Sequence, residues 1–188
     1  MRLVYFLAFA LLCAAGQPIS SVINQPFPSM QAETVDDKVI NIPKDTKGRV
    51  TLVGLAYSKK SEKDLSSWMS PVYNTFISQK VNPGSGGLFS SFVYDIDVYL
   101  VPMFTGIKAA AAGTAKRKAA KEMDERLMPY ILFYQGKLKP YKEALDFEKK
   151  DVPYFFLLDE AGKIVYATSG AYSERKMDGI KSAIDELE

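Results

Sequence analysis

The sequence predicts an α/β fold in which a central mixed sheet is flanked by helices. Three features indicate it: a buried strand followed at once by an amphipathic helix at 50–77, an apolar hairpin at 152–167, and an amphipathic helix at the end of the chain. Strands and helices in this order bury one face of each helix against a sheet. The 188 residues are enough for one domain with a single core.

The first of these features is a nearly continuous apolar run at 50–57, typical of a strand that is covered on both faces. Ser61, with Asp64 three residues later, resembles a capping box and predicts that a helix begins there. Pro71 lacks an N–H, so we expect a kink in this helix. Apolar residues at spacings of three and four mark its buried face: Leu65, Trp68, Met69, Val72, Tyr73, Phe76 and Ile77.

Shorter strands are predicted on both sides of this unit. Residues 29–34 and 38–42 are expected to pair as a hairpin across a polar break, and residues 93–101 alternate like a strand. Asp95 and Asp97 lie two apart in that strand and therefore share one face. They can bind a cation, but a solvated strand edge is the simpler interpretation, and we assign no metal site.

A helical insertion is expected before the last hairpin. Residues 102–136 read mainly as helix with an alanine-rich centre, and we interpret the whole stretch 102–150 as the insertion. Strands at 152–159 and 163–167 then form a hairpin, and a helix from about residue 173 packs against the sheet.

The N-terminal end has the pattern of a signal peptide. Arg2 is followed by an apolar run from Leu3 to Ala15, so we expect residues 1–16 to be removed on export. Residues 17–26 are then an extended lead-in, and the domain spans 27–188. An uncleaved segment would instead anchor the protein to the membrane. We therefore expect a periplasmic protein, which is free after cleavage or associated with the inner membrane without it.

Composition excludes several chemistries. The chain has no histidine, and its single cysteine, Cys13, lies within the expected signal peptide. This rules out a Ser-His or Cys-His pair, a disulfide, haem, and zinc held by nitrogen or sulfur in the mature protein. With 24 basic against 22 acidic residues, the net charge favours no nucleic acid. We expect no cofactor, no small-molecule substrate and no enzymatic activity.

The order of elements, together with Val152 and Pro153 leading into FFLLDEAGKIV, resembles the thioredoxin fold and its cis-proline strand. In that fold the active dithiol lies between the first long strand and its helix, which corresponds here to Ser58-Lys59-Lys60-Ser61. The resemblance therefore implies a thioredoxin-like fold whose redox pair is absent, because a serine hydroxyl has no redox cycle.

A narrower resemblance covers residues 47–172. GRVTLVGLAYS, Ser67-Trp68 followed by Pro71, the helical insertion and FFLLDEAGKIVYATSG are together similar to the mitochondrial ATP synthase assembly-factor family. This implies a chaperone-like role in the assembly of a membrane complex, performed by binding a protein partner. A signal peptide in place of a mitochondrial presequence indicates a bacterial relative. The alternative is a thiol-disulfide oxidoreductase or peroxiredoxin lineage that has lost its cysteines.

Two sets of residues are candidate binding sites. The first surrounds the former dithiol position, where serines also serve simply as helix caps and a proline simply begins a strand. Its members are Tyr57, Ser58, Ser61, Val152 and Pro153. The second is a run of positive charges suited to docking on anionic lipid or an acidic partner. It comprises Lys108, Lys116, Arg117, Lys118 and Lys121.

The positive run also has a simpler interpretation. At helical spacing its members scatter around the axis, and Lys118 with Glu122 and Lys121 with Glu125 are spaced for ordinary surface pairs.

Overall fold

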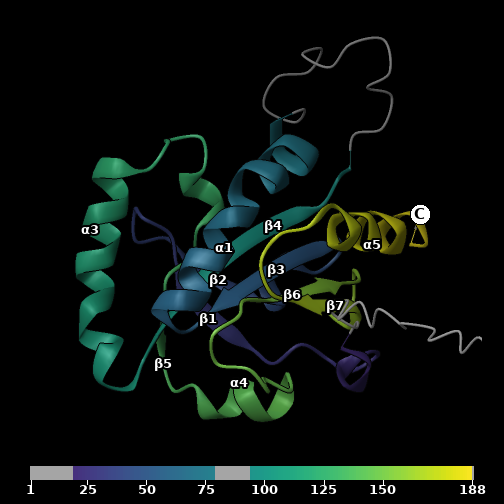
Figure 1. The fold of residues 1–188 in the computed structure, drawn as a ribbon, viewed down its shortest axis with the longest axis horizontal. Coiled ribbons are helices and arrows are strands. Elements are labelled where there is room, and N and C mark those ends of the chain that lie inside the picture. The colour runs from purple at the N-terminus through teal and green to yellow at the C-terminus, as the bar shows by residue number, and fades with distance from the viewer. Residues whose placement is uncertain (1–18, 79–93, 188) are drawn as a thin grey trace, which may run out of the picture.

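The computed structural model describes residues 19–78 and 94–187. Five strands form a mixed sheet in the order β5-β4-β3-β6-β7, and two more form a separate hairpin, β1-β2 (Figure 1). The strands are β1 (Met30–Glu33), β2 (Val39–Ile42), β3 (Thr51–Ala56), β4 (Asp97–Thr105), β5 (Tyr134–Gly136), β6 (Tyr154–Leu158) and β7 (Ile164–Ser169). The longer helices are α1 (Lys59–Val72), α3 (Ala112–Glu122), α4 (Lys139–Ala144) and α5 (Glu174–Asp185).

Strand β3 is the centre of the sheet. It runs parallel to β4 and antiparallel to β6, and all six of its residues are buried. A strand covered on both faces needs no alternation of polar residues, which explains its continuous apolar run. The predicted α/β class, the mixed sheet and the hairpins at 29–42 and 152–167 are confirmed.

The core has two halves, one on each face of the sheet. On one face, α1 and α5 pack over β3 and β6, with Trp68 fully buried against Phe155 at 4.1 Å between ring centroids. On the other face, the β1-β2 hairpin, α4 and the N-terminal segment cover the same strands. Helix α3 lies beside the β5 edge of the sheet (Figure 1), and its Ala115 and Ala119 pack against the half of the core that contains Trp68.

Helix α1 begins earlier than predicted. Ser58 is its N-cap, and the capping box joins Ser58 to Ser61 rather than Ser61 to Asp64. Helix α1, in which we expect a kink at Pro71, continues through this proline and passes into a π-helical turn at Tyr73–Ile77. A proline removes one hydrogen bond of the regular ladder, and such turns are one way in which a helix accommodates the loss.

The prediction that residues 102–136 are mainly helix is wrong at both ends. Strand β4 continues through Pro102 to Thr105, and residues 134–136 form the edge strand β5. The missing N–H of Pro102 falls where pairing with the neighbouring strand is interrupted, between the bridge at Leu100 and the resumed ladder at Met103. Only the middle of the stretch is helical, as a 3-10 turn at Gly106–Ala111 followed by α3.

The expected lead-in is part of the folded structure over the residues described. It contains a 3-10 turn at Ser20–Val22, and its backbone is hydrogen-bonded to β7, for example from the Asn24 N–H to the Ile164 carbonyl at 2.8 Å. The expected signal peptide at 1–16 lies outside the described residues. Over 19–78 and 94–187, no helix combines the length and the apolar character needed to cross a membrane.

Candidate functional site

Two buried serines occupy the turn between β3 and α1. The Ser58 Oγ accepts the Ser61 N–H at 3.0 Å, and the Ser61 Oγ accepts the Ser58 N–H at 2.8 Å. The Ser61 Oγ also accepts the Tyr57 N–H at 3.1 Å. Ser61 is 0% exposed and Ser58 is 4% exposed. The two side chains therefore hold the turn from inside, because together they accept the N–H groups of Tyr57, Ser58 and Ser61.

The hydroxyl protons of this pair have defined acceptors. Both lone pairs of the Ser61 Oγ are used by backbone N–H groups, and its own proton goes to the Ser58 carbonyl at 3.0 Å. The Ser58 hydroxyl, which lies 3.1 Å from both the Ser61 Oγ and the Asp151 Oδ1, therefore donates to the Asp151 carboxylate. This bond ties the start of α1 to the segment that leads into β6.

Tyr57 makes a second connection between the same two segments. Its hydroxyl donates to the Lys149 carbonyl at 3.2 Å, and its ring stacks on Phe147 with 5.3 Å between centroids. Burial raises the pKa of the Tyr57 phenol to about 12. The Tyr57 side chain is thus neutral and packed, and its hydroxyl is already hydrogen-bonded within the chain.

Pro153 differs from the cis-proline of the thioredoxin fold that its strand resembles. The Val152–Pro153 peptide bond is not cis, and the cis bond found among the described residues joins Ile42 to Pro43. Pro153 is buried, and its carbonyl accepts the Gly170 N–H at 2.8 Å, so it extends the β6-β7 ladder by one residue. The simpler interpretation, in which this proline begins a strand, fits this geometry.

The structure therefore brings the first candidate set into one region, with the serines facing inward. Lys59, Lys60 and Asp151 are among the exposed side chains around them. A serine hydroxyl at a helix N-terminus has neither a thiol's acidity nor its redox cycle. The arrangement can bind through its surface, but it supplies no group for disulfide exchange.

The positive run does not form one face. Lys116 is turned inward, with a side chain 12% exposed, and its Nζ is bonded to the Glu33 Oε2 at 2.7 Å and to the Asp37 carboxylate. Burial lowers the pKa of Lys116, but the hydrogen bonds to Asp37 and Glu33 outweigh it and leave the pKa above its ordinary value. Lys116 therefore fastens α3 to the β1-β2 hairpin.

The other members of the run are more exposed. Lys118 pairs with Glu122 at 3.7 Å, as the spacing predicts, and Arg117 donates to the Thr114 hydroxyl at 3.1 Å. Helix α3 ends at Glu122, so Glu125 lies beyond it and not one turn along from Lys121.

Sequence reasoning missed two features, an ion-pair cluster and a groove. Arg49 binds Asp95 at 2.7 Å and Asp97 at 2.9 Å, so the cation held by this aspartate pair is a side chain 46 and 48 residues away in sequence. Within the described residues, no cluster of carboxylates, cysteines or histidines could hold a metal ion.

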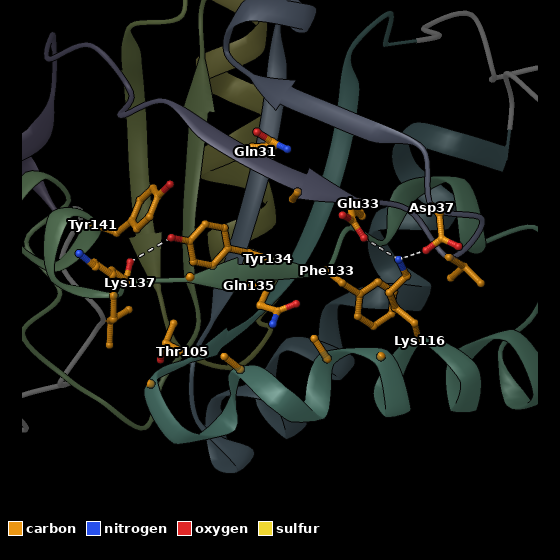
Figure 2. Close-up of a pocket in the computed structure, with 18 of the residues that line it drawn as sticks. Gln31, Glu33, Asp37, Thr105, Lys116, Phe133, Tyr134, Gln135, Lys137 and Tyr141 are labelled. Carbon is orange, nitrogen blue, oxygen red and sulfur yellow. Dashed lines mark hydrogen bonds and ion pairs between the residues drawn. The ribbon is translucent and has the colours of Figure 1, made fainter.

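The second missed feature is a groove of about 1520 Å³ between β1, β5 and α3, which we call the β5 groove. Figure 2 shows Tyr134 and Gln135 along its middle, Gln31 on the β1 side, and Lys116 with Glu33 and Asp37 across one end. No local sequence signal marks it, because its walls come from three separate segments of the chain.

Comparisons with known proteins agree with this geometry. A SCO1/SenC family lipoprotein from Bacillus anthracis str. Ames superposes with a TM-score of 0.56 at 16% identity, covering 91% of this chain and 97% of that one. BsSco, a member of the Sco family of cytochrome c oxidase assembly proteins, gives 0.55 at 12% identity, with coverage of 91% and 98%. At these identities the likeness shows the fold alone.

A putative thiol:disulfide interchange protein DsbE from Chlorobium tepidum gives a TM-score of 0.52 at 16% identity, with 86% of this chain and 97% of that one covered. No curated protein matches the chain in sequence. The sequence model of the family described as ATP10 protein matches residues 24–187. The chain thus belongs to the ATP10 protein family, with a thioredoxin-like fold and no CxxC dithiol.

Proposed function

We propose that this protein is a non-catalytic, chaperone-like factor that assists the assembly of a membrane complex, such as ATP synthase, by binding a protein partner. The observation that carries the proposal is the closed serine pair at the dithiol position. Ser58 and Ser61 are buried, and their hydrogen bonds are used within the chain, so this turn supports a binding fold instead of a reaction. Membership of the ATP10 protein family supports an assembly role.

The competing function is a thiol-disulfide oxidoreductase or peroxiredoxin activity. It is favoured by one of the fold relatives, which is described as a thiol:disulfide interchange protein. Disulfide exchange needs an attacking thiolate and usually a second, resolving thiol. This chain contains one cysteine, Cys13, so the chemistry has no second partner within the chain.

We further propose that the protein acts after export, in the periplasm beside the inner membrane. Ile107 is 101% exposed on the turn before α3, next to the exposed Lys108. An apolar side chain beside cations suits contact with an anionic lipid surface or with the rim of a membrane complex. With the exposed Lys118 and Lys121, these residues form the proposed docking surface. We omit Lys116 and Arg117 because both line the groove.

The test is chemical crosslinking of the tagged full-length protein in membranes of its native host, followed by identification of the captured proteins. Recovery of ATP synthase membrane subunits is the expected result. In the triple variant Lys108→Gln, Lys118→Gln, Lys121→Gln, recovery should fall, because the docking surface loses three charges. The matched control changes three exposed lysines elsewhere: Lys47→Gln, Lys63→Gln and Lys142→Gln.

If only soluble exported proteins are captured, the assembly role is wrong and a general binding module replaces it. The enzymatic alternative is tested separately by insulin reduction and peroxide consumption with purified protein. Turnover by the wild-type chain would contradict the non-catalytic assignment.

A further inference from the structure

The floor of the β5 groove is the free edge of the five-stranded sheet. Strand β5 pairs with β4 on one side only, and next to it Phe133 exchanges two backbone hydrogen bonds with Glu33 of β1, at 3.1 and 2.7 Å. This single antiparallel bridge fixes the direction in which β1 and β5 run past each other.

Beyond the bridge the pairing stops. Backbone groups of successive residues in a strand point alternately to its two sides, so the N–H and C=O of Gln135 point the same way as those of Phe133. By the same rule, Gln31 of β1 presents its groups on the side of Glu33. Within the described part of the chain no strand pairs with either edge here. Two short strand edges therefore line one groove.

The residue that precedes β1 shows that such outward groups need partners. The Ser29 carbonyl, on the same side as Gln31, is occupied by the Tyr141 hydroxyl at 2.9 Å. An edge with outward N–H and C=O groups is a template for an added strand.

The opposite wall, formed by α3 and the turn before it, is made mainly of small residues. An alanine or glycine lies at each of the following groove positions: Gly106, Ala109, Ala112, Gly113 and Ala120. A Cβ added at Gly113 meets only the Arg117 Nη1, at 3.7 Å. Small residues leave this wall set back from β5, and the volume of about 1520 Å³ is large enough for several residues of extended chain.

The two ends of the groove differ in charge. At one end, Lys116 binds Glu33 and Asp37, and the neighbouring Arg117, which also lines the groove, donates to the Thr114 hydroxyl. At the other end, Lys137 and Lys139 are exposed, and Lys139 has a carboxylate partner only at 3.7 Å, in Glu143. Figure 2 shows Lys137 and Lys116 at opposite ends. A ligand that fits this pattern carries negative charge at the Lys137 end.

We propose that the β5 groove binds an extended segment of a partner protein by strand addition at Gln135 and Gln31, with an acidic residue of that segment at Lys137 and Lys139. The site lies outside the former dithiol position and involves no residue of the docking surface. This proposal rests on the proposed function, because it assigns the binding of the protein partner to the β5 groove.

The experiment uses full-length protein and peptides of alternating threonine and valine, about six residues long, the usual length of a strand. One peptide carries glutamates at its end, and a matched one carries lysines. Binding is measured by fluorescence anisotropy, and backbone amide hydrogen exchange locates the site. We expect the acidic peptide to bind, with slower exchange of the Gln135 and Gln31 amides.

Two variants and their controls test the geometry. Gly113→Trp fills the groove and should weaken binding of the acidic peptide about tenfold or more. Ala110→Trp, on an exposed residue that does not line the groove, should not. Lys137→Glu with Lys139→Glu should reverse the charge preference, whereas Lys142→Glu with Lys150→Glu should leave it unchanged. Circular dichroism confirms that each variant is folded.

Equal binding by Gly113→Trp, or no protection of the two amides, would overturn the proposal. Two other results would also overturn it. If the Gln135 and Gln31 amides are already protected without peptide, or if the wild type is a dimer that Gly113→Trp dissociates, the groove is filled by another occupant. The proposed function fails separately. If the wild type and Gly113→Trp capture membrane subunits equally, the assembly role stands and the proposal for the β5 groove fails. If peptides bind in the groove but no membrane subunit is captured, the groove proposal stands and the assembly role fails.

Discussion

Ser61→Ala should be among the more damaging single-atom deletions in this protein, although the residue forms no catalytic site. The substitution removes one oxygen that accepts the N–H groups of Tyr57 and Ser58, at 3.1 and 2.8 Å, in a position that is 0% exposed. No other acceptor for those two N–H groups exists among the described residues. Water cannot replace the oxygen without opening the turn.

The magnitude follows from the count of groups left without a partner. Each buried N–H that loses its acceptor costs about 1 to 2 kcal/mol, so the free energy of unfolding should fall by about 2 to 4 kcal/mol. Ser58→Ala removes the N-cap acceptor and the bond to Asp151, and should cost about 1 to 2 kcal/mol. Ser66→Ala is the matched control: its exposed hydroxyl only bonds back to the Lys63 carbonyl, and its effect should stay within about 0.5 kcal/mol.

Urea unfolding monitored by tryptophan fluorescence gives these values directly. Trp68 is the only tryptophan in the chain, and its indole N–H donates to the Gly170 carbonyl at 3.0 Å, so its signal reports the packing of α1 on the sheet. If Ser61→Ala is as stable as Ser66→Ala, the serine pair does not hold the turn and our reasoning about this site is refuted.

Three further predictions concern strand β3 and the turn that follows it. Because the two Oγ atoms of Ser58 and Ser61 lie 3.1 Å apart, the double variant Ser58→Cys, Ser61→Cys should form a disulfide under oxidising conditions, measured by loss of free thiols. Failure to oxidise would show that the turn has lost the dithiol geometry. Burial raises the pKa of Tyr57 from 10.0 to about 12, so its contribution to stability is present below pH 10 and is lost as the pH rises to 12. Between pH 10 and pH 12 the free energy of unfolding of Tyr57→Phe should therefore fall less steeply than that of the wild type. Equal slopes of unfolding free energy against pH would contradict this. Gly54→Ala places a Cβ 2.6 Å from the Phe155 ring and should cost about 1 to 3 kcal/mol in the urea assay, whereas a neutral effect would mean that the ring moves freely.

Elements with a strong local pattern were predictable from sequence. Strand β3 is marked by its continuous apolar run, and the β6-β7 hairpin by apolar strands around a glycine turn. The edge strand β5 was missed because it is three residues long and next to a helix-like stretch. The start of α1 was misplaced by three residues, since two overlapping capping boxes are present in the sequence and only tertiary contacts, including the Asp151 bond, select the first.

The candidate site was predicted only in part. The dithiol position could be located from the order of elements, and the structure places its members together, but the inward direction of Ser61 depends on the turn that it holds. Lys116 looks like any other surface lysine in sequence, and only the approach of the hairpin to α3 turns it toward Glu33 and Asp37. The β5 groove depends on three segments far apart in the chain, so no local pattern predicts it.

The central claim, partner binding without thiol chemistry, is tested most directly by crosslinking in native membranes after all accessible thiols have been alkylated. We predict that the same membrane subunits are captured with and without alkylation, in adducts that resist reduction. Loss of the partner after alkylation, or its capture only as an adduct released by a reducing agent, would contradict the account.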